Sequence, residues 1–221
     1  MKKAIIIICS LGGFMLFAFI AARLTHVIDV YQVSSASNEP THPHGSIVMA
    51  SCLKTADRGA FICFKQHSTK IVRIYRCMAT EGDVVELKNA AVYVNGRFLN
   101  EPYTWNEYYI SRQQLAAIQG YVDTYKYPVN PINDSLYSIT FSTAELSKYH
   151  LNLKSVTVNK GEAYPEIFSD FSRLNFNGDN LGPLKVPKNC YFLLGDNRHN
   201  AFDSRYIGFI KKDEIISTVI E

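Results

Sequence analysis

The apolar and polar positions divide the chain into three parts. An apolar run without charged residues extends from Ala4 to Ala22, with two lysines before it and Arg23 after it. Residues 34–46, SSASNEPTHPHGS, are polar, and their Ser, Asn and Pro content predicts an extended, solvated connector. Beyond the connector, short segments rich in β-branched and aromatic residues predict a mainly β protein.

Four of these segments follow the connector closely, and a fifth ends the chain. We expect strands at residues 59–64, 70–78, 83–87, 90–99 and 214–221. The Asn95-Gly96 pair inside the fourth segment predicts a two-residue hairpin turn, because both residues tolerate the positive φ that such a turn requires. The core is therefore expected to contain antiparallel hairpins.

The middle of the chain has a different character and predicts two short helices. Ser111 and Gln114 are spaced as a capping box, and Ser142 and Glu145 repeat that spacing. Proline and turn-forming residues separate the two segments. We interpret this block as a lobe inserted into the β core.

The expected domain organisation has four parts. Residues 1–23 form an N-terminal anchor and residues 24–45 a connector. The β core consists of residues 46–100 and 186–221, and residues 101–185 form an inserted α+β cap lobe.

The N-terminal apolar run has two interpretations. A helix of this length, at about 1.5 Å per residue, nearly crosses a bilayer core of about 30 Å, which favours an uncleaved transmembrane anchor. A cleaved secretory signal would have a shorter apolar core, although FAFIAA offers a weak cleavage site. We prefer the anchor, and Lys2 and Lys3 favour a cytoplasmic N-terminus with the remaining chain outside.

Composition excludes several classes of function. The net charge is +3, and the 23 basic and 20 acidic residues are mixed along the chain, so there is no basic stripe for nucleic acid. The five cysteines form no CxxC pair and suggest no zinc site. We expect no metal and no cofactor. In an exported domain one disulfide is an alternative to cysteines that are simply small buried residues.

The segment GDNRHNAFDSR, residues 195–205, is the most specific motif in the chain. It resembles the C-terminal signature of type I signal peptidases, roughly GDNR-x-N-S-x-DSR. EGDVVELKNAAVYVNGRFL, which starts at Glu81, is similar to the PGD turn and hairpin of the same family. The resemblance implies a signal peptidase I-like β-barrel or sandwich core. It also implies a single-pass protein of the bacterial cytoplasmic membrane, with its C-terminal domain extracytoplasmic.

The charged residues of this motif are expected to support the site rather than to react. Aspartate–arginine pairs form charge-assisted, often bidentate hydrogen bonds, and in the resembled family they hold the loop beneath the catalytic centre. The alternative is an ordinary surface network of ion pairs. The predicted supporting residues are Asp196, Asn197, Arg198, Asp203, Ser204 and Arg205.

The resemblance also implies a serine nucleophile soon after the anchor, in a motif roughly like S-x-SM-x-P-T. We align PHGSIVMAS with this motif, which makes Ser46 the candidate nucleophile. Its backbone, together with His44 in the place of a family serine, is the candidate oxyanion site. The alternative for Ser46 is a turn serine that follows Gly45.

The general base of the resembled family is a neutral lysine in a sequence like IKR-x-x-G-x-PGD. This chain reads IYRCMATEGD, so Tyr75 occupies the lysine position and is our candidate for the catalytic position. Ala201 replaces the serine that accompanies the lysine. Arg73, two residues from Tyr75, is expected on the same strand face but cannot accept a proton, and Lys70 is expected on the opposite face.

Three functions follow from these residues. The first is a membrane-anchored serine endopeptidase that cleaves signal peptides of exported preproteins with an unusual base. The second is a catalytically silent homologue that binds signal-peptide-like segments, or that partners an active peptidase. A plain extracytoplasmic β domain is the third. In the first two, the partners are signal peptides, bound as an added β-strand, and the lipid bilayer. Residues 47–49 face either the membrane or the core.

Overall fold

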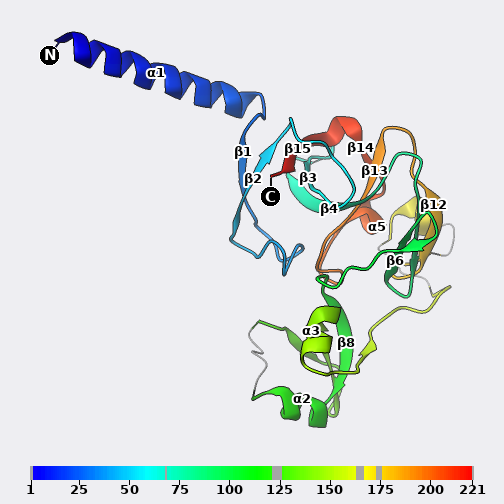
Figure 1. Cartoon of the computed structure of the whole chain (residues 1–221). Helices are drawn as coiled ribbons and strands as arrows, with labels where there is room; N and C mark the ends of the chain where they lie inside the picture. Colours follow the sequence, from blue (N-terminus) through cyan, green and yellow to red (C-terminus); the bar gives the residue numbers. More distant parts are fainter. Residues whose placement is uncertain (1, 68, 121–125, 163–166, 173–175, 221) are drawn as a thin grey trace.

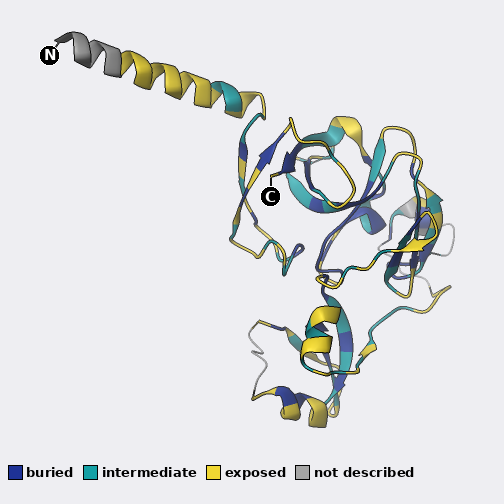
Figure 2. Ribbon diagram, viewed as in Figure 1, coloured by how far each residue is buried: buried dark blue, intermediate teal, exposed yellow. Residues whose placement is uncertain are grey.

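A long helix projects from the folded body of the protein. The computed structural model describes residues 2–67, 69–120, 126–162, 167–172 and 176–220. Helix α1 (Lys2–Leu24) extends away from the remaining elements (Figure 1), and its described side chains are almost all exposed (Figure 2). Over the residues that the structure describes, no helix combines the length and apolar character needed to cross a bilayer.

The body is mainly β, as the sequence predicts. Its largest sheet is antiparallel and runs in the order β1-β2-β15-β3-β4-β13-β14, with α5 and a short 3-10 helix, η1, before and after β14. The elements are β1 (Asp29–Gln32), β2 (Ile47–Ser51), β3 (Phe61–Phe64), β4 (Arg73–Thr80), β13 (Cys190–Leu194), α5 (Ser204–Ile207), β14 (Ile210–Lys211), η1 (Lys212–Glu214) and β15 (Ile215–Val219).

A second sheet packs against the first and shares an apolar core with it. Its order is β12-β5-β6-β7, and its strands are β5 (Val84–Lys88), β6 (Ala91–Val94), β7 (Arg97–Phe98) and β12 (Leu181–Lys185). The turn between β6 and β7 is the predicted Asn-Gly turn, with φ of 53° at Asn95 and 74° at Gly96. Phe192 of the first sheet and Val85 of the second lie in the same buried cluster, which also receives Phe171 from α4 (Ser169–Ser172).

The inserted lobe has its own sheet and its own core. The sheet order is β11-β8-β10-β9, and the elements are β8 (Asn106–Ser111), α2 (Arg112–Ile118), β9 (Val129–Pro131), β10 (Leu136–Phe141), α3 (Thr143–Lys148) and β11 (Lys154–Ser155). Both predicted capping boxes are confirmed, at Ser111 with Gln114 and at Ser142 with Glu145. Figure 1 shows the lobe at one end of the body, remote from α1.

Two boundaries differ from the sequence-based expectation. β1 lies within the predicted connector but pairs with β2, so residues 29–32 belong to the core sheet. β12 lies within the predicted lobe but pairs with β5 of the second sheet. In both cases a short strand carries too few alternating positions to be distinguished from loop in the sequence, and pairing with a distant strand defines it.

Candidate functional site

The loop between β1 and β2 is folded against the core instead of being solvated. Its base is closed by two backbone hydrogen bonds, from Val33 N to Ser46 O (2.8 Å) and from Gly45 N to Val33 O (2.7 Å). Within the loop, the residues Ser37 and Asn38 are only 7% and 2% exposed. The expectation of a solvated connector is therefore wrong for this part of the chain.

Polar contacts to two other segments hold the loop in place. Asn197 donates its backbone N–H to Ser37 O (3.0 Å) and its Nδ2 to Ala36 O (3.2 Å). Asn38 Nδ2 donates to the carbonyl oxygen of Ile74 in β4 at 2.6 Å. These bonds fix the loop between the 195–205 segment and the start of β4, which explains why polar residues are buried here.

Ser37 lies close to Tyr75, Gly195 and Ala201, which come from two other parts of the sequence. A Cβ added to Gly195 would lie 2.4 Å from Ala201 Cβ, 2.5 Å from Ser37 O and 3.4 Å from Tyr75 Cδ1. Only glycine fits at position 195, because any side chain would overlap the Ser37 backbone. The structure therefore brings Ser37, Tyr75 and Ala201 to one point.

The phenol of Tyr75 is buried and protonated at neutral pH. The residue is 5% exposed. Burial raises the pKa of Tyr75, and the negative charge of Asp203 raises it further. Hydrogen bonding to the Ser37 side chain, the positive charge of Arg73 and hydrogen bonding to the Phe202 backbone lower the pKa, but they do not outweigh burial. A neutral phenol is a poor proton acceptor, so Tyr75 is unsuited to act as a general base for a neighbouring hydroxyl.

A groove of about 250 Å³ opens beside these residues. Residues 31–35 line one wall and residues 71–75 the other, with Ser37 and Asn38 also contributing. β4 pairs with β13 only from Arg76 onwards, and β1 is the outermost strand of its sheet. The groove thus lies between two strand edges, which is an arrangement suited to an added extended peptide.

The predicted supporting residues form a buried network behind this groove. Arg205 donates Nε to Asp203 Oδ1 (2.8 Å) and Nη2 to Asp203 Oδ2 (2.9 Å), and Asp203 also accepts from Gly195 N (3.1 Å). A third Arg205 bond, from Nη2 to the carbonyl of Arg198, is 2.6 Å long. The network is not a surface one, because Asp203 and Arg205 are 0% and 2% exposed.

A second ion pair connects the same segment to β4. Arg76 donates Nε and Nη2 to the two carboxylate oxygens of Asp196, at 2.8 and 2.7 Å. The hydroxyl of Thr41 donates to the same carboxylate. Ser204 Oγ accepts from Leu193 N at 2.9 Å, which binds α5 to β13. Every member of the predicted supporting set lies in or next to this network.

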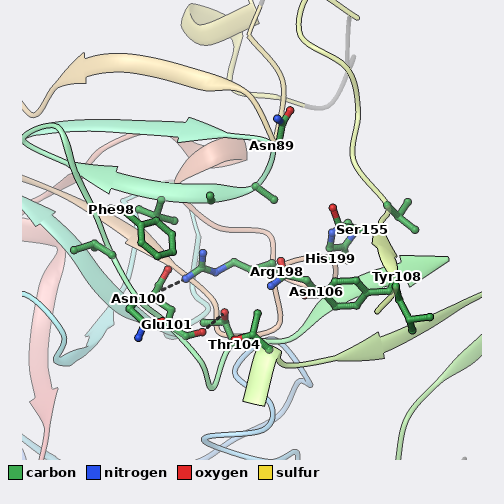
Figure 3. Close-up of a pocket in the computed structure, with 17 residues that line it drawn as sticks. Asn89, Phe98, Asn100, Glu101, Thr104, Asn106, Tyr108, Ser155, Arg198 and His199 are labelled. Carbon is green, nitrogen blue, oxygen red and sulfur yellow. Dashed lines mark hydrogen bonds and ion pairs between the residues drawn. The ribbon is translucent and has the colours of Figure 1, made fainter. Parts of the chain in front are cut away.

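Arg198 links the network to the inserted lobe. Its Nε donates to Gly195 O (3.0 Å) and its Nη2 to Glu101 Oε1 (2.7 Å). Figure 3 shows this pair in the wall of a cavity of about 250 Å³ that lies between the second sheet and the lobe. The lobe is thus attached to the core through the same segment that positions Ser37.

Ser46 and His44 do not line the groove with Tyr75. The Ser46 hydroxyl donates to Pro43 O at 2.6 Å, and the Ser46 backbone N–H donates to the same oxygen at 3.0 Å. Both groups are used within the turn that closes the loop, so neither is available to an oxyanion. His44 is exposed, and its backbone N–H donates to Glu39 Oε1 at 3.3 Å.

A comparison with protein families identifies the chain. The model of a family described as "Signal peptidase, peptidase S26" matches residues 5–220. The chain belongs to this signal peptidase family. The resemblance noted in the 195–205 motif is therefore confirmed over nearly the whole sequence.

Individual relatives agree with this assignment. Signal peptidase I of Bacillus amyloliquefaciens is 26% identical over 98% of this chain and 80% of its own length. Signal peptidase I of Aquifex aeolicus is 29% identical over 90% of this chain and 78% of its own length. Among solved structures, a signal peptidase I from Enterococcus faecalis covers 76% of this chain and 98% of its own, with 21% identity and a TM-score of 0.39.

The sequence interpretation missed Ser37, although a signal for it is present. Ser35, Ser37, Pro40 and Thr41 follow the order S-x-S-x-x-P-T of the signal peptidase motif, with Asn38 in place of its methionine. Ser35 Oγ lies 3.1 Å from Ser37 Oγ and donates to it. Alignment on the distance from the apolar run led to Ser46, whereas alignment on the Pro-Thr pair leads to Ser37.

Proposed function

We propose that this protein binds signal-peptide-type segments of exported proteins in the groove beside Ser37 and cleaves them slowly or not at all. In this proposal Ser37, and not Ser46, occupies the nucleophile position of the family, with Ser35 beside it at the oxyanion position. Tyr75 and Ala201 occupy the positions of the lysine base and its serine partner.

The observation that carries the proposal is the buried, neutral phenol of Tyr75 beside Ser37. A serine hydroxyl attacks a peptide bond efficiently only when a base accepts its proton. Burial raises the pKa of Tyr75, so no phenolate is present at neutral pH to serve as that base. Among the described residues that line the groove there is no lysine and no histidine. The groove therefore retains a hydroxyl without an adequate proton acceptor.

Binding does not need that base. An extended peptide placed between β1 and the start of β4 would pair with main-chain groups of these strand edges other than Ile74 O, which Asn38 already occupies. Two small hydroxyl side chains, Ser34 and Ser35, border the groove and leave space for such a peptide. The preprotein segments that the family processes are of this extended kind.

We further propose that α1 anchors the protein in the bilayer and that the folded body is extracytoplasmic. The described side chains of α1 support this, because a series of large apolar residues is exposed along it. They are Leu11, Phe14, Met15, Leu16, Phe17, Phe19, Ile20 and Leu24. Exposed apolar surface of this extent is unfavourable in water and favourable in lipid. Retention in the membrane pellet after alkaline extraction is the expected result.

The second candidate, a working peptidase, is favoured by the intact Ser35–Ser37 pair. A working peptidase would need a proton acceptor from outside the groove, such as a group that a partner protein supplies. It predicts product formation only when that partner is present.

Peptide binding tests the proposed function. A fluorescent peptide with an Ala-x-Ala segment is titrated with the full chain in detergent, and anisotropy is recorded. Ser34→Trp, which fills the groove, is expected to weaken binding at least tenfold. Ser147→Trp on the exposed side of α3 is the matched control and is expected to leave binding unchanged. Equal binding by both variants would show that the peptide binds elsewhere.

A further inference from the structure

We propose that Arg73 makes the groove selective for an extended peptide that carries a carboxylate about two residues from the position beside Tyr75. This inference rests on the proposed function, because it names the class of peptide that the groove accepts. It goes further by assigning a specificity-determining residue outside the Ser37 and Tyr75 positions.

Arg73 gives the groove its charge. Among the described residues that line the groove, Arg73 is the only one with a formal charge. Within the described part of the chain its guanidinium donates a long hydrogen bond of 3.4 Å from Nη1 to Gln66 Oε1, which is a neutral acceptor. No carboxylate of the described chain forms an ion pair with it, so its charge is available to a ligand.

Two carboxylates that act on tyrosines of the groove already have partners. Asp203 acts on the Tyr75 phenol but is held by two hydrogen bonds, from Nε and Nη2 of Arg205. Asp29, which influences Tyr31 in the groove wall, lies 3.0 Å from His26 Nδ1. Neither carboxylate is free to neutralise Arg73, so the groove is electropositive and complementary to an anionic ligand.

The position of Arg73 sets the distance between the ligand carboxylate and the peptide bond beside Ser37. Arg73 and Tyr75 are two residues apart in β4, and the Arg73 charge lowers the Tyr75 pKa, so both side chains face the same region. Residues two apart on a strand are separated by about 6.8 Å. A peptide lying along β4 as an added strand has the same repeat, so its side chain two positions away reaches Arg73.

Asn38 provides an independent indication that a peptide occupies this groove. The residue is 2% exposed and lines the groove. Its Nδ2 is bonded to Ile74 O, whereas its Oδ1 has no hydrogen-bond partner in the described part of the chain. A buried acceptor without a donor is unfavourable by about 1–3 kcal/mol. A main-chain N–H of a peptide that reaches this oxygen would supply that donor, which a simple anion cannot do.

Two sources of the carboxylate share this chemistry. One is an aspartate or glutamate side chain within a longer segment. The other is the free C-terminal carboxylate of a peptide that ends in the groove. The test therefore contains both.

The test compares labelled peptides that differ only at the proposed contact. The first set carries Glu, Gln or Lys two residues before or two residues after the alanine of the binding segment, and the second set ends two residues after that alanine with a free or an amidated C-terminus. Each is titrated by anisotropy into the full wild-type chain in detergent, and into Arg73→Gln and Arg73→Glu. Arg97→Gln is the matched control, because Arg97 is exposed on β7 and outside the groove.

We expect the wild-type chain to bind either the Glu peptide or the peptide with the free carboxylate about tenfold more tightly than its neutral counterpart, the size of one charge-assisted contact. Whichever pair shows the preference identifies the source. The preference is lost in Arg73→Gln, reverses in favour of Lys or the amide in Arg73→Glu, and persists in Arg97→Gln.

Three results would overturn the inference. Equal affinity for the charged and neutral members of both sets removes the selectivity but leaves groove binding intact. A preference that persists in Arg73→Gln assigns the selectivity to another residue. If no peptide of either set binds to the wild-type chain, the proposed function fails together with the inference.

Discussion

The segment 195–205 and the cluster around Ser37 lie side by side and have opposite properties. In the segment, the buried charges have partners: Asp203 with Arg205, and Asp196 with Arg76. In the cluster, the side chain of Ser37 lies beside the phenol of Tyr75, the Ala201 methyl is near the Ser37 backbone, and no base is present among the described groove residues.

The difference has a physical cause. Removing one partner of a buried ion pair leaves an uncompensated charge, which costs about 3–5 kcal/mol. Replacing a buried amine and its hydroxyl partner by a phenol and a methyl leaves no charge behind, and the Tyr75 hydroxyl still hydrogen bonds with Ser37 and Phe202. A chain with this fold therefore cannot easily lose its supporting network, but it can lose its base and remain folded.

The largest expected effect comes from supplying a base beside Ser37. Tyr75→Lys combined with Ala201→Ser supplies an amine and its hydroxyl partner beside Ser37, and we expect cleavage of a preprotein to rise by about 10³-fold or more. Tyr75→Lys alone is expected to give less, because Ala201 leaves the amine without an acceptor. Cleavage is measured by mass spectrometry of the products.

The control for this experiment is the same double variant carrying Ser37→Ala, which should be inactive. A double variant that stays inactive despite normal folding would mean that Ser37 is not at the nucleophile position. Full recovery by Tyr75→Lys alone would mean that position 201 has no part in the reaction.

The next effect concerns the supporting network. Asp203→Ala leaves the guanidinium of Arg205 buried without its partner. We therefore expect the free energy of unfolding to fall by about 3–5 kcal/mol. Denaturant unfolding followed by fluorescence measures it. Asp213→Ala, at a carboxylate whose side chain is 69% exposed, is the control and should change little. Equal midpoints for both variants would contradict the supporting role.

A smaller effect is expected at Asp83, a carboxylate outside the network. Burial raises its pKa, but hydrogen bonds from the Thr80 backbone, Arg58 and Asn95 outweigh burial and lower it from 3.8 to about 2. Because the folded-state pKa is the lower one, this carboxylate stabilises the fold above pH 3.8, and the contribution disappears as the pH falls through about 2.

The measurement is the stability of the wild-type protein and of Asp83→Asn against pH. We expect Asp83→Asn to be less stable by about 2 kcal/mol at pH 6, with the difference vanishing towards pH 2. A difference that stays constant over this range would show that the charge of Asp83 is not responsible.

The smallest expected effect comes from removing one hydrogen bond between the two regions. Asn197→Ala removes the 3.2 Å bond from Nδ2 to Ala36 O that holds the Ser37 loop to the network. We expect peptide binding to weaken by about fivefold, since one neutral hydrogen bond contributes about 1 kcal/mol. Anisotropy with the Ala-x-Ala peptide measures this. Asn189→Ala, outside the groove, should bind normally; a similar loss there would show that the effect is not local.

Local sequence signals predicted much of this fold. The Asn95-Gly96 turn and the capping boxes at Ser111 and Ser142 each depend on a few neighbouring residues, and the structure confirms them. β12 was not predicted, because it is defined by pairing with β5, about a hundred residues earlier in the sequence. Elements defined by distant pairing leave little trace in their own sequence.

The same reasoning applies to the candidate site. The aspartates and arginines of residues 195–205 could be grouped from the sequence because they lie within one short motif. Ser37 was placed in a solvated connector, because its polar neighbours resemble an ordinary loop. Their burial depends on Asn197 and Ile74, which accept or donate hydrogen bonds from far along the chain. Ser46 occupied the expected distance from the apolar run but closes a turn.

The central claim is that the groove holds a peptide beside a hydroxyl that lacks a base. The most direct measurement follows one labelled preprotein peptide with the purified full chain, recording binding by anisotropy and product by mass spectrometry between pH 7 and pH 9. The account predicts saturable binding with little or no product above the level that Ser37→Ala forms. Product that accumulates with the wild-type chain as fast as with the Tyr75→Lys/Ala201→Ser variant and is absent with Ser37→Ala, while Ser46→Ala behaves as wild type, would contradict it.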